Sequence, residues 1–148
     1  MKRKLASFFV IFGVVLLVSS GCGKKGPPFI PQKAFSLKVD KLRSELKDSF
    51  VVLKGQIVSP PGKRNDISDV TGCRVYHSWY APEDPPCEGC PIDYPGYQEI
   101  KGEMHSGEIF SCELSLKKRN GIHFFKVHLI GQKGVVGPPS NRAKLILE

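Results

Sequence analysis

Two cysteines separated by two residues, Cys87 and Cys90, form the pattern in this chain that is best suited to chemistry. A Cys-x-x-Cys pair acts as a redox centre when a helix N-terminus or nearby cations lower the pKa of one thiol. Here prolines surround the pair, Glu88 adds a negative charge, and no β-α-β pattern is present. The pattern therefore favours a local disulfide, Cys87–Cys90, within the proline-rich loop 82–95.

Two further cysteines, Cys73 and Cys112, lie in predicted strands. Cys73 has the same strand parity as Val75, and Cys112 has that of Phe110 and Leu114, so both are predicted to point into the interior. Cysteines that face each other can bridge when their Cα atoms lie within about 4.4–6.8 Å. A Cys73–Cys112 disulfide is predicted; it would close a loop of roughly forty residues and contribute on the order of 3–4 kcal/mol.

The four cysteines leave two alternatives open. A four-cysteine zinc site is one, although structural zinc sites usually have two close pairs, and here only Cys87 and Cys90 are close in sequence. An envelope redox or metal-handling protein that uses Cys87 and Cys90 is the other. Two structural disulfides, with no metal and no resident cofactor, are the main expectation.

The fifth cysteine, Cys22, ends an N-terminal pattern typical of a secretion signal. Residues 1–4 include three basic side chains, residues 5–18 are apolar or small, and residues 19–21 are small. The pair Gly21-Cys22 resembles the bacterial lipobox, in which a small residue precedes the cysteine that receives a diacylglycerol. The resemblance implies cleavage before Cys22, and a diacylglycerol and an N-acyl chain on that residue.

The same resemblance predicts where the chain resides and how it is divided. Each buried methylene of an acyl chain contributes about 0.8 kcal/mol, so two or three chains hold a protein firmly to a bilayer. Gly23, rather than Asp, after the lipidated cysteine implies an outer-membrane location facing the periplasm. The predicted organisation is a signal peptide over 1–21, a lipidated and flexible Pro/Gly/Lys tether over 22–33, and one domain over 34–148.

The charge of the chain restricts the classes of partner. The net charge is +8, and removal of the three basic residues of the signal lowers it to +5. These charges are scattered, and no nucleic-acid motif is present, so nucleic acid is excluded as the expected partner. The membrane, through the lipid anchor, and an envelope protein or polysaccharide are the partners that this chain is expected to have.

Segments of alternating apolar and polar residues predict an all-β fold. Asn120-Gly121 is a strong hairpin turn signal between two of these segments. Six or seven short strands without a convincing amphipathic helix are typical of a sandwich. The segments are 35–39, 50–58, 70–80, 109–116, 122–130 and 143–147.

Two of these segments resemble strands of fibronectin type III domains. Residues 72–77, Gly-Cys-Arg-Val-Tyr-His, resemble the third strand of that family, and residues 125–129, Phe-Lys-Val-His-Leu, resemble its sixth. The tether 22–28, Cys-Gly-Lys-Lys-Gly-Pro-Pro, and the insertion 87–91, Cys-Glu-Gly-Cys-Pro, resemble those of bacterial lipoproteins that carry one such domain. The resemblance implies an immunoglobulin-like sandwich of about seven strands.

The remaining polar residues do not form a catalytic pattern. No serine-centred elbow, paired carboxylates or phosphate-binding glycine loop is present, so the chain is not expected to be an enzyme. His123 and His128 lie five residues apart on one predicted strand and must face opposite sides of its sheet, which prevents joint chelation. His123 is predicted to be a core or corner residue.

Four aromatic residues near the proline-rich loop, Trp79, Tyr80, Tyr94 and Tyr97, are the predicted partner-binding residues. Aromatic side chains on a rigid loop lose little entropy on binding, which favours them in recognition surfaces. The alternative is that they pack over the loop as a small satellite core. The expected function is a lipid-anchored binding or structural module of the cell envelope.

Overall fold

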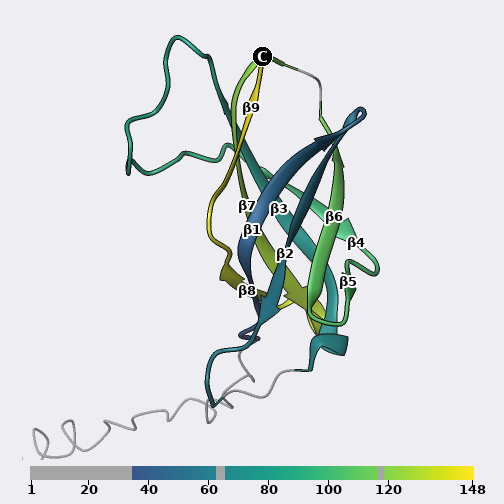
Figure 1. Cartoon of the computed structure of the whole chain (residues 1–148). Coiled ribbons are helices and arrows are strands. Elements are labelled where there is room, and N and C mark those ends of the chain that lie inside the picture. The colour runs from purple at the N-terminus through teal and green to yellow at the C-terminus, as the bar shows by residue number, and fades with distance from the viewer. Residues whose placement is uncertain (1–34, 63–65, 117–118) are drawn as a thin grey trace, which may run out of the picture. The chain divides into compact units, whose positions relative to one another are not determined.

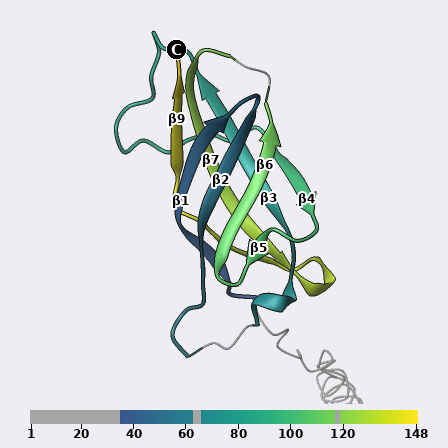
Figure 2. The ribbon, with the colours of Figure 1, turned by 45° about the vertical axis from the view of Figure 1, so that its right-hand side comes forward.

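The computed structural model describes residues 35–62, 66–116 and 119–148. The predicted signal peptide, Cys22 and the tether lie outside the described residues. The compact unit spans Lys33–Glu148 and consists of two antiparallel sheets packed face to face (Figures 1 and 2). Within the described part of the chain, no helix is long and apolar enough to span a membrane.

The front sheet in Figure 1 has the strand order β1-β2-β6-β5. Its members are β1 (Lys38–Lys47), β2 (Phe50–Val58), β5 (His105–Ser106) and β6 (Ile109–Ser115). The sheet behind it has the order β4-β3-β7-β8, and β9 also pairs with β7. Its members are β3 (Val70–Tyr80), β4 (Tyr97–Lys101), β7 (Gly121–Gly131), β8 (Val136–Pro139) and β9 (Ala143–Leu147). Two short 3₁₀ turns, η1 (Ile67–Asp69) and η2 (Gln132–Gly134), adjoin β3 and β7.

The predicted all-β sandwich is confirmed, with nine strands in place of about seven. The three strands that the sequence pattern missed are β4, β5 and β8. They are short, and none of them shows a regular alternation of buried and exposed residues. Because β4 and β5 are outer strands of their sheets, little of their sequence is constrained by burial.

Alternation of buried and exposed residues places the core between the sheets. In β6, Phe110, Cys112 and Leu114 are buried while the residues between them are exposed. In β7, Phe125 and Val127 are fully buried, and Lys126 between them is half-buried. Burying one large aliphatic or aromatic side chain stabilises a fold by about 1.5–3 kcal/mol. The largest fully buried side chains are Phe110, Phe125, Leu37, Leu53 and Leu129.

One asparagine links the sheets at a break in the first strand pair. The register of β1 against β2 shifts between Asp40 and Arg43, so the two intervening residues, Lys41 and Leu42, have no partner in that ladder. The side chain of Asn141 replaces the missing strand contacts: its Oδ1 accepts from the Leu42 N–H at 2.7 Å, and its Nδ2 donates to the Leu42 carbonyl at 3.1 Å. Buried backbone groups need such partners, so Asn141 completes the ladder from the opposite sheet.

Candidate functional site

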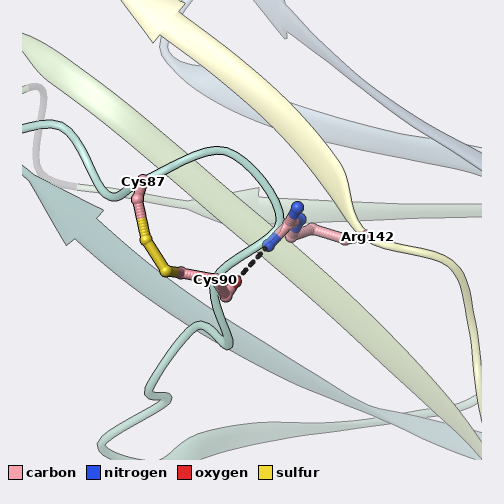
Figure 3. Close-up of a disulfide and its surroundings, with 3 residues drawn as sticks. All are labelled: Cys87, Cys90 and Arg142. Atoms are coloured by element: carbon pink, nitrogen blue, oxygen red, sulfur yellow. Dashed lines mark hydrogen bonds between the residues drawn. A yellow bond between two sulfur atoms is a disulfide. The ribbon is translucent and has the colours of Figure 1, made fainter.

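The long connection between β3 and β4, residues 81–96, carries the Cys-x-x-Cys pair and is called the cysteine loop below. Cys87 and Cys90 form a disulfide, as predicted, with their Cα atoms 5.3 Å apart (Figure 3). The Cys90 N–H donates to the Cys87 carbonyl at 3.1 Å, and Gly89 has a φ of 82°. Glycine adopts a positive φ without steric cost, which suits it to the third residue of this turn.

Arg142 attaches the cysteine loop to the back sheet. Its Nη1 donates to the Cys90 carbonyl at 3.2 Å, and Figure 3 shows the guanidinium reaching the loop from the segment that precedes β9. The same guanidinium lies 5.2 Å from the centre of the Phe124 ring, and Tyr80 packs edge-on against that ring at 5.9 Å. Phe124 alternates with the core residue Phe125, so it points away from the core, yet it is only 7% exposed.

A group of tyrosines lies on this outward side of the back sheet. Tyr76 of β3 stands opposite Tyr97 in the register with β4, and their ring centres are 5.4 Å apart. Tyr94, from the cysteine loop, packs edge-on against Tyr76 at 6.2 Å, and His128 of β7 packs at 5.2 Å. Burial raises the pKa of the Tyr94 hydroxyl.

Two cations complete this surface. The Lys126 ammonium lies 4.5 Å from the centre of the Tyr94 ring and 5.1 Å from that of Tyr76. The Arg74 guanidinium lies 4.6 Å from the centre of the Tyr97 ring and donates to a Glu99 carboxylate at 3.1 Å, which raises the pKa of Arg74. These six residues are called the tyrosine–cation face below: Arg74, Tyr76, Tyr94, Tyr97, Lys126 and His128.

The structure separates the four aromatic residues that the sequence singled out. Tyr94 and Tyr97 belong to the tyrosine–cation face, while Tyr80 packs on Phe124. Trp79 points to the other side of β3, as strand alternation requires. Tyr80, Tyr94 and Tyr97 therefore share the outward side of the back sheet without Trp79, and the binding of a partner at these positions stays a prediction.

Trp79 contacts the turn that precedes β7. Its Nε1 donates to the Asn120 carbonyl at 3.1 Å, and the Arg119 guanidinium lies 3.2 Å from the centre of its ring. A Cβ on Gly121 would lie 2.5 Å from the Trp79 Nε1, and Gly121 has a φ of 138°, so only glycine fits beside the indole. These contacts hold the turn before β7 in place.

Tyr76, Arg74 and Lys126 were not among the sequence-predicted site residues. The alternation of side chains along β3 could have identified the two residues on that strand. Because Cys73 and Val75 face the core, Arg74 and Tyr76 must face outward. The convergence of Tyr94 and Lys126 on Tyr76 depends on the path of the cysteine loop and on the register of β7, which no local pattern encodes.

Cys73 and Cys112 face each other in the core, as their parity predicted, but the predicted disulfide between them is not present. Both are buried free cysteines. A hydrogen bond with the side chain of Cys112, together with burial, raises the pKa of the Cys73 thiol. The predicted cross-link is therefore corrected to two free cysteines in the core.

The four cysteines do not converge, because one pair lies inside the sandwich and the other in the cysteine loop. Among the described residues, no group of three or more metal-ligating side chains comes together. His123 is buried and His128 lies on the outward face, as the five-residue spacing predicted. No protein-family model and no curated protein matches the chain, and the resemblance to fibronectin type III domains stays a prediction.

Proposed function

We propose that this chain is a lipid-anchored module of the cell envelope that binds an acidic polysaccharide through the tyrosine–cation face. The position of Lys126 carries the proposal. Its ammonium stands between the rings of Tyr94 and Tyr76, and among the described residues no carboxylate pairs with it. A cation held in this way is available to an anionic ligand.

The charge balance of the face agrees with such a ligand. Arg74 and Lys101 share the single carboxylate of Glu99, at 3.1 and 3.8 Å, and Lys126 adds a third cation. Charge-assisted hydrogen bonds from lysine and arginine to carboxylates are stronger than neutral ones. A ligand that brings carboxylates to this face would give these cations further partners.

The tyrosines supply the other half of the recognition. Tyr97 is 52% exposed, and its ring offers an apolar surface with a polar tip. Such a surface matches a sugar ring, which has apolar C–H faces and hydroxyls at its edge. Because Tyr76, Tyr94 and Tyr97 already pack against one another, they lose little side-chain entropy when a ligand binds.

The anchor in the proposal comes from the sequence. The secretion pattern over residues 1–21 and the lipid-accepting position of Cys22 support attachment to the membrane. The tether over 22–33 then supports a domain held at the envelope, where acidic polysaccharide is available as a ligand.

Titration calorimetry with polygalacturonate, and with neutral dextran as the uncharged comparison, tests the binding. We expect polygalacturonate alone to bind, with weaker binding at high salt because exposed charges are screened. Lys126→Met and Tyr97→Ala should each reduce the affinity about tenfold. Lys54→Met and Phe50→Ala on the front sheet are matched controls, since Lys54 and Phe50 are also exposed. Equal effects of the control and test variants would contradict the proposed face.

A further inference from the structure

A pocket of about 270 Å³ opens beside the start of β4 and the end of β6. It lies at the side of the sandwich where β4 is the outer strand and where β5 covers only Ile109 and Phe110 of β6. An engineered apolar cavity of about 150 Å³ holds benzene, so this pocket has room for one substituted six-membered ring. Its lining includes Val75, His77, Pro95, Tyr97, Leu114 and Leu116.

The hydrogen bonds of two histidines determine which ring atoms carry protons. His123 Nε2 lies 2.8 Å from the Arg119 carbonyl oxygen, which can only accept, so Nε2 of His123 must carry a hydrogen. In a neutral imidazole the other nitrogen is then an acceptor. His77 Nε2 lies 2.9 Å from His123 Nδ1 and therefore donates to it.

This order of donors leaves one acceptor unused in the wall of the pocket. With its proton on Nε2, neutral His77 presents Nδ1 as a bare acceptor. No described residue donates to that atom, and it is not among the buried polar atoms that lack a partner, so solvent can reach it. Burial and the neighbouring His123 lower the pKa of His77, which agrees with a neutral ring.

We propose that this pocket binds a phenol ring, whose hydroxyl donates to His77 Nδ1 and whose ring packs against Leu114, Leu116 and Tyr97. Most of the lining is apolar, which suits a ring with a single hydroxyl better than a sugar with several. The phenol can belong to a small molecule or to a tyrosine side chain of an extended partner segment lying along β4. The site is separate from the acidic-polysaccharide face, although Tyr97 borders both.

Heteronuclear NMR on the exported chain with Cys22→Ser, titrated with p-cresol, tests the pocket. We expect saturable shifts of the Leu114 and Leu116 methyl signals and of the His77 imidazole nitrogens. The matched probe 4-methylanisole has the same ring but no hydroxyl hydrogen, and should bind about fivefold or more weakly. Equal affinity for the two compounds, or no saturable shift, would overturn the proposal.

Three further samples separate the possible outcomes. Leu116→Trp fills the pocket while leaving both histidines in the chain, so it should abolish the shifts, and p-cresol binding that survives this substitution places the phenol elsewhere. Lys126→Met should leave p-cresol binding unchanged, which separates this site from the polysaccharide face. A tyrosine-containing hexapeptide that binds at least about tenfold more tightly than p-cresol identifies a partner segment as the source, and equal affinities identify a small molecule.

Discussion

His77 donates a hydrogen bond from Nε2 to Nδ1 of His123, 2.9 Å away, and the angle between the two ring planes is 14°. The ring centre of Phe125 lies 5.0 Å from that of His77. His123 is only 1% exposed and His77 is half-buried. The pair joins the turn before β7 to the back sheet, because His123 Nε2 also donates to the Arg119 carbonyl.

The stability of the domain should therefore depend on pH through His77. Burial, and secondarily His123, lowers the pKa of His77 below its ordinary value of 6.5, so the unfolded chain binds the proton more readily than the folded one. The free energy of unfolding should fall as the pH is lowered from about 8 to about 5. Urea denaturation at several pH values measures this slope. His77→Gln should flatten it, and an unchanged slope would assign the effect to another group.

The state of the buried cysteines can be tested by counting the thiols that an alkylating reagent modifies. Because Cys73 and Cys112 are buried free cysteines, the folded chain with Cys22→Ser should resist alkylation. In denaturant without reductant, intact mass should show two alkylated sites, and after reduction it should show four, since Cys87 and Cys90 are joined. No alkylation before reduction would instead establish a second disulfide between Cys73 and Cys112.

Removing the Asn141 side chain should destabilise the sandwich without affecting either proposed site. Asn141→Ala leaves the N–H and carbonyl of Leu42 without their partners, which costs about 1–3 kcal/mol. Asn141→Asp keeps the acceptor for the N–H but loses the donor to the carbonyl, and should have an intermediate effect. Denaturation midpoints measure both variants, and a wild-type midpoint for Asn141→Ala would show that water replaces the side chain.

Trp79 and Tyr97 should respond differently to truncation, although both were predicted from the sequence to bind a partner. Trp79→Ala removes the hydrogen bond to Asn120 and the contact with Arg119, and we expect a loss of about 2 kcal/mol in stability. Tyr97→Ala removes a half-exposed ring and should cost less than about 1 kcal/mol while weakening polysaccharide binding. Denaturation and calorimetry on the same two variants separate a structural role from a binding role.

The lipid anchor can be tested by replacing its acceptor. In cells that express the full chain, Cys22→Ser should shift the protein from the membrane fraction to the soluble periplasmic fraction, because no acyl chain can then be attached. Ser20→Ala keeps the cysteine and serves as the matched control. Membrane retention of the Cys22→Ser protein would show that attachment does not depend on this residue.

Local sequence patterns predicted the layered fold and the Cys87–Cys90 disulfide. Both show in residues that are close in sequence: alternating burial along a strand, and two cysteines three positions apart. Alternation in β6 and β7 identifies their core faces directly, and the Glu88-Gly89 pair between the two cysteines suits a tight turn. The tyrosine–cation face was not predicted. Tyr76 meets Tyr97 and Lys126 only through the pairing of β3 with β4 and β7, and these strand registers follow from long-range packing.

The two ends of β7 lie beside different parts of the chain. Phe35, just before β1, lies beside Gly131 at the end of β7, whereas Tyr80 and the start of the cysteine loop stand opposite Ile122 at its beginning. The nine residue steps from Ile122 to Gly131 span about 30 Å of strand. If the chain is anchored through Cys22 as proposed, that length works as a spacer. It places the start of the cysteine loop at the opposite end of the domain from Phe35, the first residue that the structure describes.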